Sequence, residues 1–427
     1  MQLKNTLLLI SLVLMTTISF AQDVPDYGMT KEQIEFLNLD CLHQRGFTGK
    51  GVTIAHFDDG FDGFDQLKAF EYARVNNYVK GKYDFQIDGT LKYEGNGSHG
   101  TNTLSIVHGY LPGQYIGTAY NANMLLARTE YTPTETHKEE MNWKYAVDWA
   151  LENGADVITS SLQYNTFDEG EGNYDYKSDF DGNTSIIAKA ADYAASKGVL
   201  VVTIQGNFGN GDWYYLATPG DADSVLTVGA AGIDGKKAGF SSFGPSADGQ
   251  VKPDVMAVGF QTTIIEPNGD IRKGNGTSFA GPAIAGMVAC LKQAHPLRSN
   301  MEIITAVRQS ADRYGNPDIL GGYGYGIPDA CKADDILSKM DTDFEIQKSW
   351  IIKDNCQYKV NKCKLKLKPN SEHTGSIELY NTLEQKLSSA SWPTRKIKIK
   401  KLAKGNYSFR IVDKDGKIVA VENFLKK

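Results

Sequence analysis

The stretch Val52–Gly60 reads VTIAHFDDG, an apolar run that ends in two acids and a glycine. Further short apolar runs follow it along the chain, namely Met124–Ala127, Val157–Leu162, Val199–Ile204 and Val225–Val228. Helical patterns such as Glu139–Leu151 and Ser185–Ala195 lie between these runs. Continuous apolar strands that alternate with helices are typical of a parallel sheet covered on both faces. We therefore expect an α/β fold of three layers with a mainly parallel sheet.

The composition is that of a globular protein. The chain has 427 residues, of which 41% are hydrophobic and 22% are charged. These fractions exclude the disordered, collagen-like and coiled-coil classes of protein. The net charge of −6 gives the molecule no general attraction to nucleic acid.

Charge changes sign near residue 340. Residues 341–427 contain 19 Lys and Arg against 10 Asp and Glu, whereas residues 1–340 contain 26 against 41. Such a change indicates a domain boundary, although two faces of one fold would also produce it. The strand patterns of the tail are Lys362–Lys368, Ile377–Tyr380, Arg395–Lys400 and Tyr407–Val412, with a hairpin turn at Asp413–Gly416. We expect a small all-β, sandwich-like domain at residues 341–427.

The first 21 residues are typical of a signal peptide. Lys4 provides the positive charge, Leu7–Phe20 is the apolar segment, and Ala21–Gln22 offers a cleavage point. The apolar segment is short for a membrane span, which needs about 20 apolar residues. We expect a secreted protein, extracellular or at the cell surface, without stable membrane insertion; a retained anchor is the alternative.

Export would permit disulfides, and the chain has five cysteines. Cys356 and Cys363 flank a short segment and are predicted either to form a local bridge or to stay free. Cys290 lies in an apolar helical run and is predicted to be a buried small hydrophobe.

Three segments could together supply the chemistry of a nucleophilic serine. Asp58 and Asp59 end a buried strand, His99 lies in Gly97–Thr101 before a helical pattern, and Ser278 opens an apolar helix in Gly274–Pro282. Such segments converge at the carboxyl ends of parallel strands. A serine nucleophile needs a base to remove its proton, and the base needs a carboxylate to orient it.

In this order of acid, histidine and serine, the chain resembles the subtilisin-like serine peptidases, the subtilases. The resemblance covers roughly residues 30–335 and predicts a peptidase domain at residues 22–340. The segments that carry it are Gly46–Val52, His99–Thr101, Asp156–Ile158, Ser161-Leu162, Gly206-Asn207, Val228–Ala230, Phe240–Gly244, Lys252–Val255 and Gly276–Pro282.

The resemblance assigns roles residue by residue. It implies that Ser278 is the nucleophile, His99 the general base, and Asp58 its orienting carboxylate. Asp59 is the competing acid, but Asp58 fits the family's spacing to the following glycine. Asn207 resembles the side chain that holds the oxyanion together with the Ser278 N–H.

The resemblance also assigns substrate contacts. Ser161 and Leu162 resemble the segment that binds extended peptide by strand addition. Gln163 and Tyr164 follow where glycines are common, so we expect a narrower or more polar cleft. Ala217 resembles the floor of the primary specificity pocket. The remaining predicted substrate-binding residues are Gly206 and Thr277.

Pro282 is expected in the first turn of the Ser278 helix, where N–H groups lack partners.

No cofactor is expected for the chemistry. Val107–Gly117 lacks the Asn-rich loop by which many subtilases hold structural calcium. Asp168–Asp181 is an acidic insertion that is predicted either to bind Ca²⁺ or to be a solvated loop.

The tail resembles the carboxyl-terminal sorting domains of the type IX secretion system. The segments that carry this resemblance are Ile377–Asn381, Leu402–Phe409, Gly416-Lys417 and Lys426-Lys427. It implies the secretion machinery as a partner. The alternative is a generic β-sandwich that binds substrate or stabilises the peptidase.

Together these patterns predict a secreted serine endopeptidase that hydrolyses proteins and peptides through an acyl-enzyme. A processing protease of narrow specificity is one alternative. A catalytically inactive binding module with a subtilase-like fold is another, although it would have no physical need for all four of Asp58, His99, Ser278 and Asn207.

Overall fold

The computed structural model describes residues 25–95, 97–340, 375–381, 386–391, 405–413 and 418–426. The chain divides into two units, Met1–Leu337 and Ser338–Lys427. The predicted signal peptide at residues 1–21 lies outside the described residues. Within the described part of the chain, every helix is too short or too polar to cross a membrane.

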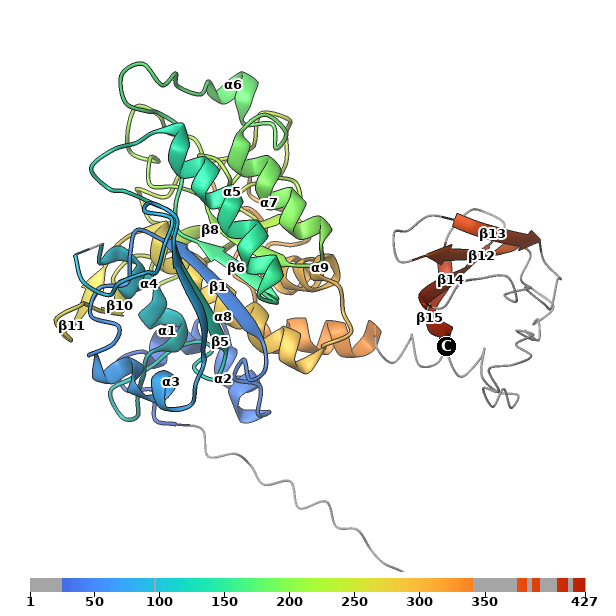
Figure 1. Cartoon of the computed structure of the whole chain (residues 1–427), viewed down its shortest axis with the longest axis horizontal. Helices are drawn as coiled ribbons and strands as arrows, with labels where there is room; N and C mark the ends of the chain where they lie inside the picture. Colours follow the sequence, from blue (N-terminus) through green and yellow to red (C-terminus); the bar gives the residue numbers. More distant parts are fainter. Residues whose placement is uncertain are drawn as a thin grey trace, which may run out of the picture. The chain divides into compact units, whose positions relative to one another are not determined.

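A seven-stranded sheet forms the centre of the first unit (Figure 1). Its strand order is β2-β5-β1-β6-β7-β8-β9. Its strands are β1 (Thr53–Asp58), β2 (Val79–Asp84), β5 (Asn123–Arg128), β6 (Val157–Ser160), β7 (Leu200–Ile204), β8 (Val225–Ala231) and β9 (Val255–Val258). All neighbouring pairs are parallel, and five of the strands are buried along their whole length. The predicted parallel α/β sheet is confirmed.

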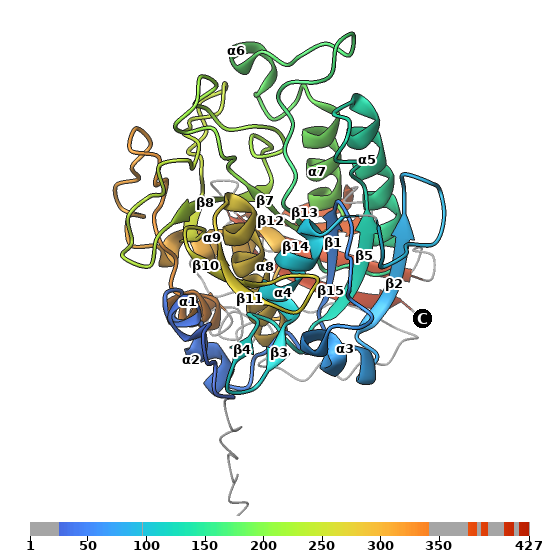
Figure 2. The ribbon, with the colours of Figure 1, turned by 90° about the vertical axis from the view of Figure 1, so that its left-hand side faces the viewer.

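Helices cover both faces of this sheet. Helices α5 (His137–Glu152) and α7 (Ile186–Ser196) pack side by side on one face, as Figures 1 and 2 show. Helices α4 (His99–His108) and α8 (Thr277–Ala294) pack together on the other face.

Side chains of β1 alternate between the two layers. Phe57 packs edge-on against Trp143 of α5, with 5.3 Å between ring centroids. His56, one residue earlier, points the opposite way and places its Nε2 2.9 Å from Nε2 of His108 in α4. Both histidines are buried, and burial lowers the pKa of His108 to about 3. Strand β1 therefore contributes side chains to the packing on both faces of the sheet. Asp58 at its end points toward α4, the same way as His56.

The other described elements of the first unit are shorter. They are α1 (Lys31–Glu35), α2 (Leu39–Gln44), η1 (Lys68–Phe70), α3 (Glu71–Val75), β3 (Tyr110–Leu111), β4 (Tyr115–Ile116), α6 (Tyr176–Asp179), β10 (Thr262–Ile265), β11 (Ile271–Gly274) and α9 (Asn300–Ser310). Strands β10 and β11 form an antiparallel hairpin that leads directly into α8.

The second unit contains a four-stranded antiparallel sheet in the order β13-β12-β14-β15. Its strands are β12 (Gly375–Asn381), β13 (Lys386–Ser391), β14 (Gly405–Asp413) and β15 (Ile418–Lys426). The predicted strands Ile377–Tyr380 and Tyr407–Val412 lie inside β12 and β14. The other two predicted strands, Cys356, Cys363 and most of the predicted turn lie outside the described residues. The all-β domain therefore stays a prediction.

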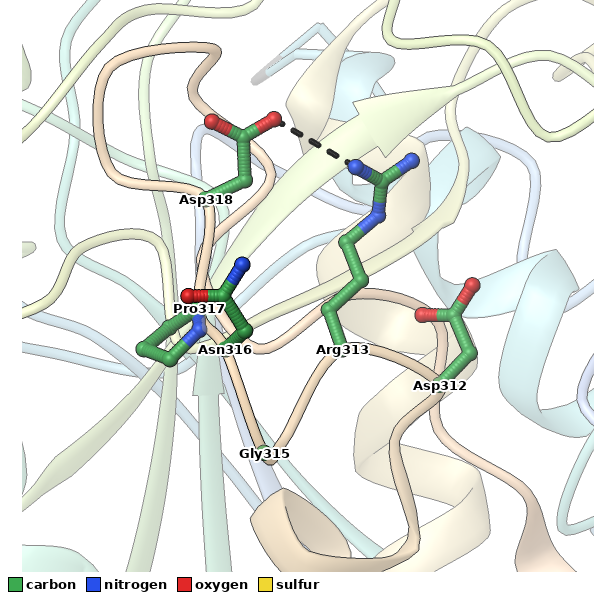
Figure 3. Close-up of a pocket in the computed structure, with 6 residues that line it drawn as sticks. All are labelled: Asp312, Arg313, Gly315, Asn316, Pro317 and Asp318. Atoms are coloured by element: carbon green, nitrogen blue, oxygen red, sulfur yellow. Dashed lines mark hydrogen bonds and ion pairs between the residues drawn. The ribbon is translucent and has the colours of Figure 1, made fainter.

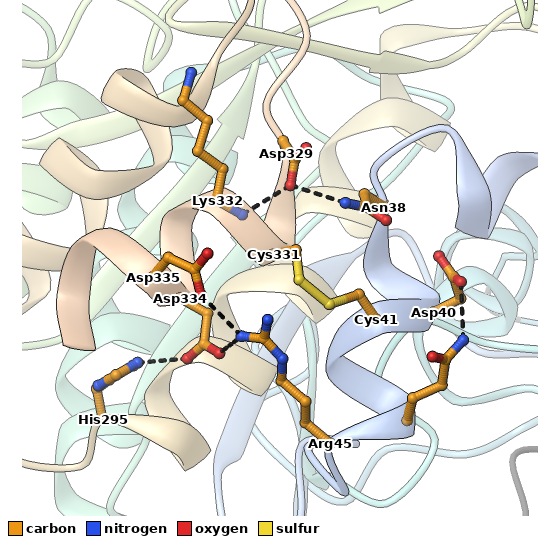
Figure 4. Close-up of a disulfide and its surroundings, with 11 residues drawn as sticks. Asn38, Asp40, Cys41, Arg45, His295, Asp329, Cys331, Lys332, Asp334 and Asp335 are labelled. Carbon is orange, nitrogen blue, oxygen red and sulfur yellow. Dashed lines mark hydrogen bonds and ion pairs between the residues drawn. A yellow bond between two sulfur atoms is a disulfide. The ribbon is translucent and has the colours of Figure 1, made fainter. Parts of the chain in front are cut away.

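A disulfide joins the two ends of the first unit. It links Cys41 in α2 to Cys331 in a helix at residues 330–340, across 290 residues of sequence (Figure 4). This pair was not predicted, because two cysteines so far apart in the sequence give no local sign that they are neighbours in the fold. Cys290 is buried and unpaired, as predicted.

Charged side chains surround the disulfide. Arg45 forms ion pairs with Asp334 and Asp335, and His295 Nε2 lies 2.6 Å from Asp334 Oδ1 (Figure 4). Burial by itself raises the pKa of Asp334, but the hydrogen bonds from His295 and Arg45 outweigh it and hold this pKa below its usual value. The ends of the domain are thus held by one covalent bond and a partly buried charge network.

Replacing both Cys41 and Cys331 by serine should destabilise the first unit. Opening so long a loop raises the entropy of the unfolded chain, and the expected loss is about 3–5 kcal/mol. For a domain of this size that is a decrease in Tm of roughly 5–8 °C. Calorimetry at a fixed scan rate, on a Ser278→Ala background that prevents self-digestion, measures it. The matched control replaces Cys356 and Cys363 instead; an equal decrease in Tm for the two pairs would contradict the prediction.

Candidate functional site

Asp58 and His99 are hydrogen-bonded to each other. Asp58 is the buried last residue of β1, and its Oδ1 lies 2.6 Å from Nδ1 of His99, the first residue of α4. Thr103, one helical turn later, donates from Oγ1 to Asp58 Oδ2 at 2.9 Å. The carboxylate therefore fixes the imidazole with its Nδ1 protonated and leaves Nε2 as the basic nitrogen.

Asp59, the competing acid, has a different partner. Its Oδ1 accepts the Gly100 N–H at 3.1 Å, at the start of α4, and its own N–H donates to Asp58 Oδ1 at 2.9 Å. Burial raises the pKa of Asp59 to about 6, and the charge of Asp58 adds to the rise. Asp59 thus binds the backbone at the start of α4, while Asp58 binds and orients the imidazole of His99.

The two carboxylates also control the protonation of His99. Burial by itself lowers the pKa of His99, but the charge of Asp58 and the hydrogen bond to it raise this pKa to about 9, with a further contribution from Asp59. The protonated imidazole is therefore stabilised strongly in the free protein.

Ser278 lies in the first turn of α8. It follows Gly276 and Thr277, is 8% exposed, and its N–H has no acceptor within the helix because it belongs to the first turn. Helix α8 packs against α4, and the ring of Phe279 stacks on that of His99, with 6.2 Å between centroids. The nucleophile predicted from the sequence and its predicted base are thus on two helices that touch at their N-terminal ends.

Pro282 is not in the first turn, so that expectation was wrong. Helix α8 begins at Thr277, which places Pro282 in the second turn. Since proline has no N–H, it cannot donate to the carbonyl of Ser278 four residues earlier. Ser161 Oγ donates to that carbonyl instead, at 2.9 Å. The proline thereby leaves the Ser278 carbonyl free to accept the Ser161 hydroxyl. This hydrogen bond connects the segment after β6 to the start of α8.

Asn207 follows the end of β7 and is exposed. Its Oδ1 accepts two hydrogen bonds from Thr277, one from the N–H at 2.9 Å and one from Oγ1 at 3.0 Å. This orientation leaves the Nδ2 amino group as the free donor. Thr277, predicted to bind substrate, orients Asn207 in this structure.

The other predicted substrate-binding residues lie around these groups. Leu162 follows Ser161, and Gly206, with φ +107°, precedes Asn207. Ala217 is fully buried in a cluster with Phe180 and Leu216, so the wall behind it is apolar. These contacts with substrate stay a prediction.

The acidic insertion Asp168–Asp181 is held by aromatic side chains. Tyr176 stacks on Tyr215 with 3.8 Å between centroids, and Phe180 is buried against Ala217. Its carboxylates bind backbone groups; Asp175, for example, caps α6 by accepting two N–H groups. In the ranges that the structure describes, the one group of three ligand side chains close enough for a metal is Asp58, Asp59 and His99. There the Nδ1 that would bind a metal instead carries the proton for Asp58. Calcium at the insertion stays a prediction.

A surface pocket of about 570 Å³ lies elsewhere in this unit, lined by Asp312, Arg313, Gly315, Asn316, Pro317 and Asp318 (Figure 3). Arg313 Nη1 lies 3.3 Å from Asp318 Oδ2, so the two side chains point toward each other. None of the predicted site residues lines this pocket.

Sequence reasoning missed Thr103 and the orienting role of Thr277. A signal existed for Thr103, because it lies four residues after His99 and so on the same face of the helix. For Thr277 there was no such signal, since its partner Asn207 lies 70 residues away in the sequence.

Comparison with known proteins finds curated relatives of this chain. The chain is 28% identical over 307 residues to Subtilisin NAT from Bacillus subtilis subsp. natto, over 71% of this chain and 70% of the relative. Subtilisin E from Bacillus subtilis (strain 168) matches with the same identity and coverage.

Solved structures share the fold. MycP1 with its N-terminal propeptide removed superposes with a TM-score of 0.53 at 23% identity, covering 71% of this chain and 96% of that one. The prenylagaramide maturation protease PagA gives 0.53 at 22% identity, covering 70% and 98%. The model of the Peptidase_S8 family, the subtilases, matches residues 49–326. The chain belongs to the subtilase family.

Proposed function

We propose that this protein is a secreted serine endopeptidase that cleaves proteins and peptides through an acyl-enzyme on Ser278. The observation that carries the proposal is the hydrogen bond from His99 Nδ1 to Asp58, which leaves Nε2 as a base beside the N-terminal end of α8. Subtilases are serine peptidases, so family membership supports the same reaction.

The proposed reaction begins with attack of Ser278 Oγ on the scissile carbonyl. His99 Nε2 accepts the hydroxyl proton, and Asp58 stabilises the imidazolium that forms. The tetrahedral intermediate then collapses, and His99 gives the proton to the departing amine. Water repeats the sequence on the acyl-enzyme and releases the second product.

The negative oxygen of the intermediate requires hydrogen-bond donors that are already oriented. We assign this role to Asn207 Nδ2 and to the Ser278 N–H. Two observations support the assignment: Thr277 occupies the acceptor end of the Asn207 amide, and the Ser278 N–H is one of the unpaired donors of the first helical turn.

The substrate backbone has an open edge to bind. Among the described residues, neither Leu162 nor Gln163 makes a backbone hydrogen bond, although Ser161 and Tyr164 on either side are anchored. An extended peptide added here would run past Ser278. We propose Ser161, Leu162, Gly206 and Ala217 as its contacts.

For residues 341–427 we propose a sorting role through the type IX secretion machinery. The resemblance of their sequence and their excess of positive charge support it. The signal peptide at residues 1–21 would first direct the chain out of the cytoplasm.

Ser278→Ala should abolish both peptide hydrolysis and labelling by a fluorophosphonate probe, because no other group replaces the attacking oxygen. Mass spectrometry of the labelled wild-type protein should place the probe on Ser278 alone. Wild-type protein that is folded and yet unlabelled would favour the inactive binding module. Full hydrolysis by the purified alanine variant would contradict the assignment of the nucleophile.

Asn207→Ala and Asn207→Asp should each lower kcat by about 10²–10³-fold with little change in KM, a magnitude known from the corresponding donor of subtilisin. The aspartate keeps the shape and the contacts to Thr277 but has no donor. Steady-state kinetics measures both variants. An aspartate variant with nearly wild-type kcat would show that Asn207 is not the oxyanion donor.

The rate should rise with pH through an apparent pKa above 6.5, because His99 acts as a base only when neutral and its pKa is raised to about 9. Profiles of kcat/KM report this group in the free enzyme. NMR titration of His99 in Ser278→Ala, with and without Asp58→Asn, is the direct check. The Asp58→Asn change should lower the pKa; an unchanged pKa would show that the carboxylate does not set it.

Deleting residues 341–427 should spare peptide hydrolysis and retain the enzyme in the cell envelope. Every residue proposed for the chemistry lies before residue 340. Assays of medium and periplasm from the native host compare the two lengths of chain. A truncated enzyme that reaches the medium normally would contradict the sorting role, and one that unfolds would support the structural alternative.

A further inference from the structure

Gln163 lies in the first of two segments near the start of α8. The same segment contains Ser161, whose Oγ donates to the Ser278 carbonyl at 2.9 Å. Tyr164 then pairs with Thr218 through two backbone hydrogen bonds, of 2.9 and 3.2 Å. Gln163 is thus held in place by anchored neighbours on both sides.

The side chain of Gln163 reaches across to the second segment. A Cβ atom built on Gly206 would lie 2.8 Å from Gln163 Oε1 and 3.0 Å from Ser242 Oγ. Gly206 directly precedes Asn207, whose amide we propose for the oxyanion. The Gln163 carboxamide therefore lies beside the residue that directly precedes the proposed oxyanion donor.

The carbonyl oxygen of this carboxamide lacks a partner. Oε1 of Gln163 is buried and accepts no hydrogen bond from any residue that the structure describes. A buried acceptor without a donor costs about 1–3 kcal/mol, so such atoms in native proteins usually meet a ligand or a water molecule. We take substrate as its donor, because Oε1 lies beside Gly206, the residue before Asn207.

We propose that Gln163 selects the substrate residue that contributes the scissile carbonyl, by hydrogen bonding to its side chain, and that it favours Asn and Gln. This inference rests on the proposed peptidase function. A carboxamide offers one donor group and one acceptor, so a second carboxamide satisfies both ends. Apolar side chains would leave Oε1 unpaired.

The test uses peptide amides that differ in this one residue, with Asn, Gln, Leu, Phe and Lys compared by kcat/KM. Wild-type enzyme should prefer Asn and Gln over Leu and Phe by about tenfold, the value of one hydrogen bond. Gln163→Ala should remove this preference, and Gln163→Glu should move it to Lys. A wild-type preference for Leu, Phe or Lys would overturn the inference.

Two controls separate this inference from the proposed function. Gln66→Ala removes an exposed glutamine whose carboxamide contacts Glu94, and it should leave the preference unchanged. Fluorophosphonate labelling of Ser278 in each variant reports whether the nucleophile is intact. If Ser278 is labelled and Gln163→Ala keeps the wild-type preference, the role of Gln163 is wrong while the peptidase proposal stands. If wild-type Ser278 is not labelled, the peptidase proposal itself fails.

Discussion

The close approach of α4 to the end of β1 is the constraint on which the site depends. A Cβ atom at Gly100 would lie 2.2 Å from the carbonyl oxygen of Gly60 and 2.9 Å from Cβ of Asp58. Only a glycine permits this contact. Because the helix begins so near the strand end, His99 and Thr103 both reach the Asp58 carboxylate. The orientation of the imidazole is therefore a result of backbone packing.

The start of α8 is fixed by a similar use of unpaired backbone groups. Pro282 removes the N–H that would bind the Ser278 carbonyl, and Ser161 takes its place. The N–H of Thr277, unpaired within the helix, binds the Asn207 amide. Thus one helix terminus connects the ends of β6 and β7.

The two neighbouring acids, Asp58 and Asp59, have different hydrogen-bond partners. Asp58 is the last residue of β1 and Asp59 directly follows the strand. Both carboxylates reach the start of α4, but their oxygens meet different groups. Asp58 accepts hydrogen bonds from the side chains of His99 and Thr103 and from the Asp59 N–H. Asp59 Oδ1 accepts the backbone N–H of Gly100. Away from the site, the disulfide between Cys41 and Cys331 joins α2 to the helix at residues 330–340.

The amino-acid sequence by itself determined the parallel sheet and its strands β1, β5, β6, β7 and β8, because apolar periodicity is a local property of the chain. The two edge strands, β2 and β9, were not predicted. The sequence also placed Asp58, His99, Asn207 and Ser278 at strand ends and helix starts, where parallel topology brings them together. Only the tertiary structure decided which group Asp59 Oδ1 meets, which way the Asn207 amide points, and that Cys41 faces Cys331. Those outcomes depend on atoms brought together by packing from distant parts of the chain, and no local pattern encodes such distances.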